Sequence, residues 1–227
     1  MINVLREFEN AISGVQNLNA IHDHLLNDLH LNVAASEILR CQLVYTVSAM
    51  DRYFHEIVRV GFLEEYKGVR RKTDSYSKWS FSNKKLEEIV RFSNPRFVPS
   101  SYVETPDYVI ESDVREKNGI LAFQQPDKIK EALSLIWNYP HKIAEIAKTM
   151  AFEPTRSEND RKKLLEQKIK LISIRRNQIV HEGDIDPLTT NKREILKSDV
   201  LDCINFLNSF VHAIHTLITD SSCYISS

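Results

Sequence analysis

The stretch Ile174–Asp184, which reads IRRNQIVHEGD, decides how this chain is organised. It ends a long helical pattern that begins near Ser157, and Gly183 supplies the left-handed residue on which many helices stop. We expect its apolar members to anchor the helix end to a core; these are Ile174, Ile179 and Val180. The polar members are then presented at the helix end, where they can converge on a ligand.

The spacing of the polar residues determines which of them share a helix face. Asn177 and His181 are four residues apart and lie on one face. Arg176 precedes His181 by five residues, about 140° around a helix that turns roughly 100° per residue. Only the long arginine side chain, or a distorted last turn, brings the guanidinium near the imidazole.

These residues resemble the signature of a known superfamily. Arg176, four intervening residues and His181 resemble the Arg-x4–6-His signature of the HEPN superfamily, the higher eukaryote and prokaryote nucleotide-binding domains. Asn177 matches the polar position that follows the arginine. The resemblance implies an all-α, HEPN-like helical bundle with Arg176, Asn177 and His181 as catalytic residues. Arg175 and Glu182, which flank them, are expected to support the site.

A second block strengthens the resemblance. Ser48–Glu56, which reads SAMDRYFHE, is similar to the second-helix motif of the RiboL-PSP branch of that superfamily. Asp51 and His55 are four apart and therefore adjacent on one helix face. They form either a surface or interhelical pair, or a pair that supports the motif helix. The family pattern favours the second interpretation.

The chemistry of metal-independent RNA cleavage fits arginine and histidine. One group must take the proton from the ribose 2′-OH, another must stabilise charge on the phosphate, and a third must protonate the departing 5′ oxygen. Histidine suits both proton transfers because its ordinary pKa is about 6.5. Arginine offers a permanently charged, planar fork to phosphate oxygens. One such set is too small for all three tasks, and the resemblance implies a homodimer that faces two motifs across a shared cleft.

We therefore predict a metal-independent endoribonuclease, of the kind that acts as a toxin or phage-defence effector, with RNA as its substrate. An antitoxin or another regulatory protein is a possible partner. The alternative is a non-catalytic HEPN-like dimer that binds a nucleotide or a protein. A weaker option is a plain helical scaffold in which His181 only interacts with the dipole at the helix end. Intact Arg176, Asn177 and His181 favour the enzyme.

Composition narrows the class of protein. The chain has 227 residues, only five glycines, 42% hydrophobic and 27% charged residues, which favours a soluble, helical domain with a core of its own. Its net charge of −1 gives no general attraction to nucleic acid, so an RNA site must be local. Three cysteines without metal-ligand spacing, no signal-peptide pattern and no long apolar run indicate a cytoplasmic protein without a membrane span. We expect no cofactor and no metal site.

A local basic segment lies between residues 67 and 96. It holds nine basic and three acidic residues, interleaved with Tyr76, Trp79 and Phe81. Cations beside aromatic rings suit single-stranded nucleic acid, although a solvated connector with inward-packed aromatics would look the same. The predicted RNA-binding residues are Arg70, Arg71, Lys72, Lys84 and Lys85.

Apolar spacing predicts a single domain, 1–227, with six or seven helices. The expected helices cover residues 3–30, 34 or 36 to 66, 82–90, 127–137, 140–150, 157–183 and 199–218. Four prolines and an Asn-Gly pair predict an irregular insert at about 94–126, with a short extended piece at Tyr108–Ile110. Such an insert is often a lid or a partner-binding loop.

Overall fold

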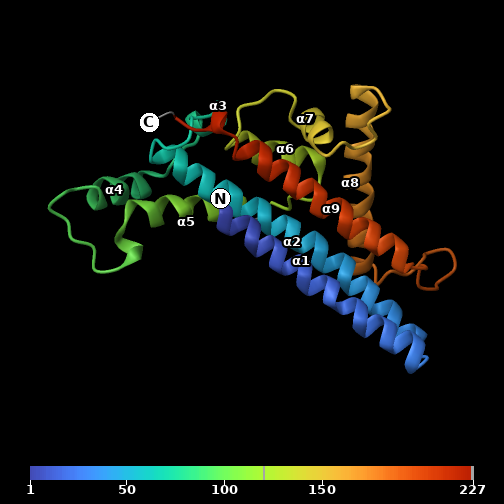
Figure 1. Ribbon diagram of the computed structural model, residues 1–227. Coiled ribbons are helices and arrows are strands. Elements are labelled where there is room, and N and C mark those ends of the chain that lie inside the picture. Colours follow the sequence, from blue (N-terminus) through green and yellow to red (C-terminus); the bar gives the residue numbers. More distant parts are fainter. Residues whose placement is uncertain (120, 226–227) are drawn as a thin grey trace.

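A computed structural model describes residues 1–119 and 121–225 and shows an all-α protein (Figure 1). In chain order the α-helices are α1 (Ile2–Asp23), α2 (Asn32–Tyr66), α3 (Asp74–Ser77), α4 (Asn83–Phe92), α5 (Pro106–Asn118), α6 (Pro126–Ser134), α7 (Lys142–Thr149), α8 (Glu158–His181) and α9 (Lys197–Ile218). The only β structure in the described residues is two isolated bridges, Arg70–Tyr224 and Ile185–Lys192. The all-α class is confirmed, with more helices than the six or seven predicted.

Helix α2 is the spine of the bundle. Its 35 residues run antiparallel to α1, and α9 lies along both helices (Figure 1). The side chains at the centre of α2 are almost fully buried, including Met50, Tyr53, Phe54 and Phe62, none of which exceeds 2% exposure. The helix ends at Tyr66, and Gly68 follows with a φ of +70°, as its sequence position predicted.

The motif helix α8 has the predicted limits. Ser157 caps its start, because the Ser157 hydroxyl accepts a hydrogen bond from the Asp160 amide at 3.2 Å. The helix ends at His181, and Gly183 adopts the left-handed conformation with a φ of +63°. Helix α8 packs against α7 and α2, so its C-terminal half lies beside the spine.

The segment predicted as an irregular insert at 94–126 contains a helix at its centre. Helix α5 occupies its middle, and Val109, Ile110 and Val114 are buried where α5 packs against α2. The extended piece predicted at Tyr108–Ile110 was therefore wrong. Pro106 stands in the first helical turn, where its missing N–H is harmless, and Thr105 accepts a hydrogen bond from the Tyr108 amide. That proline begins a helix and does not break one.

Candidate active site

Arg176 lies on the inward face of α8. The face begins with Leu165, Ile169 and Ser173, whose exposures are 0%, 1% and 2%, and Arg176 continues the same line of three- and four-residue steps. The Nε of Arg176 is buried, and none of the described residues forms a hydrogen bond with it. Its Nη1 donates to Oδ1 of Asn177 at 3.1 Å, which turns the guanidinium toward the edge of the helix.

His181 lies on the outward face. Its side chain is exposed, and no hydrogen bond joins it to the described residues. Leu171 and Ile174 precede it at helical spacing and are 56% and 41% exposed. Val180 is 43% exposed, so the expectation that Ile174 and Val180 anchor the helix to the core was wrong. Of the three expected anchors only Ile179 packs against the core, because α8 is covered on one side.

Asp51 and His55 of α2 lie beside Arg176. Oδ1 of Asp51 accepts a hydrogen bond from the Phe123 amide at 2.5 Å, and Oδ2 is 3.9 Å from Nε2 of His55. The ring centroids of His55 and Phe123 are 4.7 Å apart. Burial raises the pKa of Asp51, while the Phe123 amide and the charges of His55 and Arg176 oppose that rise. The two sequence blocks thus meet through Asp51.

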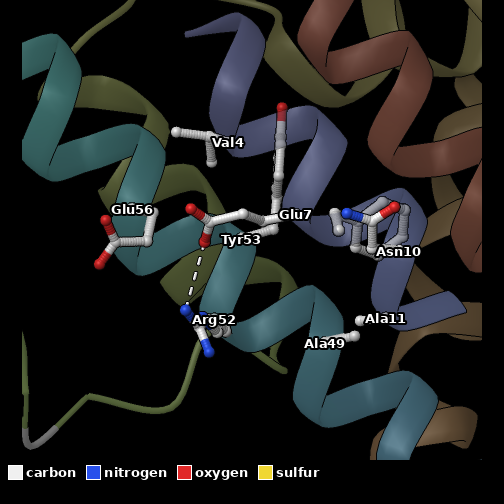
Figure 2. A pocket seen from close by; sticks show the side chains of 9 residues that line it. Val4, Glu7, Asn10, Ala11, Ala49, Arg52, Tyr53 and Glu56 are labelled. Carbon is white, nitrogen blue, oxygen red and sulfur yellow. Dashed lines mark hydrogen bonds and ion pairs between the residues drawn. The ribbon is translucent and has the colours of Figure 1, made fainter. Parts of the chain in front are cut away.

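The other side chains of the second block point elsewhere. Arg52 donates to Glu7 of α1 at 3.2 Å across a hollow of about 250 Å³ between α1 and α2 (Figure 2). Tyr53 faces the same hollow, and its hydroxyl contacts the buried His215 ring at 3.1 Å. Within this block, only Asp51 and His55 are therefore placed to support α8.

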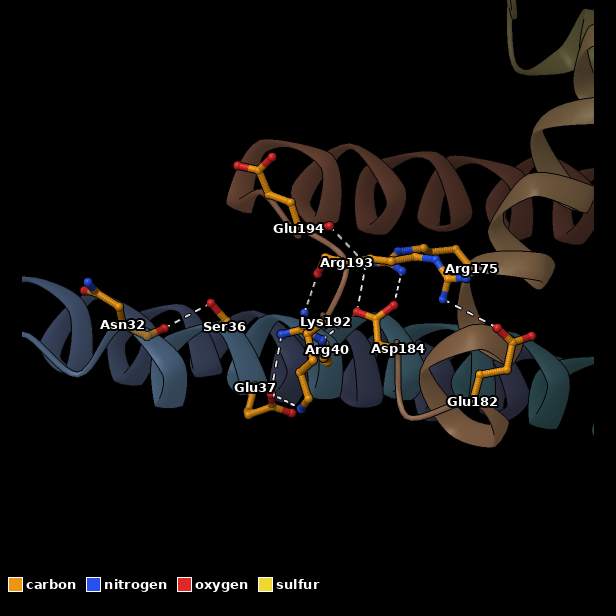
Figure 3. Close-up of polar contacts among 10 residues, drawn as sticks. All are labelled: Asn32, Ser36, Glu37, Arg40, Arg175, Glu182, Asp184, Lys192, Arg193 and Glu194. Atoms are coloured by element: carbon orange, nitrogen blue, oxygen red, sulfur yellow. Dashed lines mark hydrogen bonds and ion pairs between the residues drawn. The ribbon is translucent and has the colours of Figure 1, made fainter. Parts of the chain in front are cut away.

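The segment after His181 is fixed by a buried carboxylate, as Figure 3 shows. Asp184 has 0% exposure and accepts hydrogen bonds from Arg175 on both oxygens, with Nη2 at 2.9 Å from Oδ2. Nε of Arg40 in α2 donates to the same Oδ2 at 2.6 Å. The two guanidinium groups also donate to backbone carbonyls, Arg40 to Arg193 at 2.6 Å and Arg175 to Glu194 at 3.1 Å. We call Arg40, Arg175 and Asp184 the arginine clamp.

The arginine clamp gives Arg175 a structural role and includes two residues that sequence reasoning missed. Asp184 belongs to the motif stretch, but nothing in the sequence pairs it with Arg40, which is 144 positions away. Glu182 is exposed and lies 3.5 Å from the Arg193 guanidinium. Its contribution to the position of α8 is therefore weaker than that of Asp184.

The predicted RNA-binding residues divide into two groups. Arg70 has 0% exposure, and its guanidinium donates to the carbonyls of Ile136 and Ile218 and to the Tyr224 hydroxyl, so its prediction as an RNA contact was wrong. Lys85 is held between the carboxylates of Asp113 and Glu116 at 2.9 and 2.5 Å, which neutralises its charge. The exposed members of the set are Arg71, Lys72 and Lys84.

The described residues contain neither a metal-binding cluster nor a helix that could span a membrane. Across residues 1–119 and 121–225, no three His, Cys, Asp or Glu side chains gather closely enough to hold a metal ion. In the same part of the chain, no helix combines the length and apolarity that crossing a bilayer requires.

Comparison with known protein families finds a match that covers most of the chain. The sequence model of the RiboL-PSP-HEPN family matches residues 5–220, a range that begins in the first turn of α1, extends past the end of α9 and includes both sequence blocks. The chain therefore belongs to the RiboL-PSP-HEPN family, and so to the HEPN superfamily, whose domains are associated with RNase activity or nucleotide binding. No curated protein and no solved structure matches the chain.

Proposed function

We propose that this protein is a metal-independent endoribonuclease that works as a homodimer in the cytoplasm, its whole chain forming one domain. The observation that carries the proposal is the state of the motif at the end of α8. His181 is exposed and free to bind a substrate, while Arg176 stands beside Asp51 with an unsatisfied buried Nε. Family membership supports RNase action or nucleotide binding. The intact Arg176, Asn177 and His181 favour cleavage.

Asn177 connects the two halves of the motif. It accepts a hydrogen bond from Arg176 and shares a helix face with His181, four residues later. The guanidinium would hold the scissile phosphate and stabilise its developing charge, while the imidazole takes the proton from the 2′-OH. The products would then be a 2′,3′-cyclic phosphate and a 5′-OH, because the attacking oxygen belongs to the neighbouring ribose.

The outer face of α8 supports a dimer. Leu171 and Ile174 expose apolar surface on the same face as His181, and such surface beside a polar site is typical of an interaction site. A two-fold axis at this face would bring a second His181 to the first, and C2 is the commonest symmetry of oligomers. The second imidazole would supply the proton for the leaving 5′ oxygen, which one chain alone does not provide.

The test is cleavage of mixed RNA by the purified protein in EDTA. His181→Ala and Arg176→Ala should each lower the rate by at least about 100-fold, while His24→Ala, which removes another exposed histidine, should leave it unchanged. Substrates with 2′-deoxy or 2′-O-methyl riboses should resist. Wild-type cleavage by His181→Ala, or cleavage of DNA, would refute the mechanism.

Mixing the two inactive variants tests the shared site. A heterodimer of His181→Ala and Arg176→Ala retains one arginine and one histidine, on different chains. If the two chains complete one another's site, the mixture should regain part of the activity that each variant lacks. If the wild-type protein cleaves no RNA but still dimerises and binds nucleotide, the alternative function holds. The protein is then a non-catalytic dimer that binds a nucleotide or a partner protein, such as an antitoxin or another regulator.

A further inference from the structure

A second hollow opens beside the Asp51–His55 pair. Its volume is about 250 Å³, and it lies between α2 and the end of α5. The lining residues are His55, Glu56, Val114, Arg115, Asn118 and Gly119. Nε2 of His55 lies 3.9 Å from Oδ2 of Asp51, and the charge of Arg176 in turn acts on Asp51, so these two side chains connect the hollow to Arg176. We call it the α5 hollow.

The α5 hollow contains a hydrogen-bond donor without an acceptor. Asn118 is 5% exposed, and its buried Nδ2 has no hydrogen-bond partner among residues 1–119 and 121–225. Buried polar groups in folded proteins are nearly always paired, because an unpaired donor costs the free energy of its lost hydration. A ligand atom that accepts a hydrogen bond would satisfy Asn118.

Two more nitrogen-bearing groups line the same hollow. Arg115 is exposed and only loosely paired, because its Nη2 is 3.9 Å from Oε1 of Glu56. Glu56 itself is held more closely by Arg59, at 2.7 Å, which offsets its negative charge. The His55 imidazole is half-buried between Asp51 and the Phe123 ring. Guanidinium, imidazole and amide donors together suit a ligand that offers several acceptor oxygens, above all a phosphate group.

We propose that the α5 hollow binds a phosphate group of a nucleotide, and that in RNA this is a phosphate next to the scissile one. The assignment to a phosphate next to the scissile one rests on the proposed function. Arg115 and Asn118 would hold the flanking phosphate while Arg176 holds the reacting one. The bound strand would thereby be fixed at two successive positions, which supplies the orientation that cleavage needs.

The test measures binding without cleavage. The wild-type protein is titrated with adenosine 5′-monophosphate and, separately, with inorganic phosphate, by isothermal calorimetry. Asn118→Leu and Arg115→Gln should each weaken binding by at least about tenfold, because each removes a donor to a charged acceptor. Lys117→Gln is the matched control: it removes a neighbouring α5 charge that pairs with Asp113 and lies outside the hollow.

Stability separates a ligand-binding role of Asn118 from a structural one. Asn118→Leu should not lower the free energy of unfolding, because the amide makes no side-chain hydrogen bond through Nδ2. Absence of saturable binding at millimolar nucleotide, or equal weakening by Lys117→Gln, would overturn the proposal, as would unchanged binding in both test variants. If the protein binds the nucleotide but cleaves no RNA, the proposed enzyme function is wrong, whereas the proposed phosphate site stands.

Discussion

Replacing Asp184 with asparagine tests the arginine clamp most directly. Asparagine tolerates the left-handed backbone of this residue, whose φ is +61°, so the substitution removes the negative charge and little else. Arg40, which is only 5% exposed, and Arg175 would then face each other without their shared counter-ion. Removing one partner of a buried ion pair costs about 3–5 kcal/mol, and because the amide keeps one acceptor oxygen we expect about 3 kcal/mol.

Urea unfolding followed by circular dichroism measures this loss as a lower midpoint with an unchanged slope. Glu182→Gln is the control, since it removes an exposed partner of Arg193 from the same turn and should cost less than about 1 kcal/mol. Under conditions where Asp184→Asn remains folded, RNA cleavage should fall mainly in kcat, because the turn that positions His181 is loosened. Equal stability of Asp184→Asn and Glu182→Gln would refute the view that the clamp fixes the motif.

On the outer face of α8, Leu171→Glu combined with Ile174→Glu should yield a monomer in light scattering that no longer cleaves RNA; a stable dimer would place the interface elsewhere. At the end of α2, burial raises the pKa of Glu65 to about 7 from 4.5, so the folded protein holds that proton more tightly and loses stability as pH rises between these values. The free energy of unfolding of Glu65→Gln relative to wild type should therefore increase by about 2–3 kcal/mol between about pH 5 and pH 8, and a pH-independent difference would contradict this. In the basic segment, alanine at Arg71, Lys72 and Lys84 should flatten the salt dependence of RNA binding by roughly 0.7 per lost phosphate contact. Alanine at the exposed Arg156, Lys162 and Lys163, which lie just before α8 and in its first two turns, should leave that salt dependence unchanged.

Helix limits were the most predictable part of the structure. The start of α8 at Ser157, its stop at Gly183 and the long α2 all follow from capping residues and apolar spacing, which are local properties of the sequence. Helix α5 was not predicted, because the four prolines of its segment indicate breaks in helical structure. Pro106 begins a helix because it follows Thr105, which caps the first turn. A single preceding residue therefore decides whether this proline breaks a helix or begins one.

Burial was harder to predict than secondary structure. The sequence places Arg70 in a run of cations, but only the folded chain brings its guanidinium to the buried carbonyls of Ile136, just after α6, and Ile218, at the end of α9. Ile174 has the apolar side chain of a core residue, but it is exposed because α8 is covered on one side only. The proximity of Asp51 to Arg176 followed from the family pattern and not from spacing, because no local signal connects positions so far apart.

The arginine clamp also determines when, during synthesis, the chain can hold His181 in position. It joins Arg40, near the beginning of α2, to Arg175 and to the backbone at Arg193 and Glu194. A ribosome that has made α8 but not residues 184–194 therefore holds a chain in which the end of the motif is not yet fixed. If the protein cleaves RNA, a nascent or truncated copy that ends before the clamp is complete holds His181 less firmly, so full cleavage activity is expected only after residue 194 has left the ribosome.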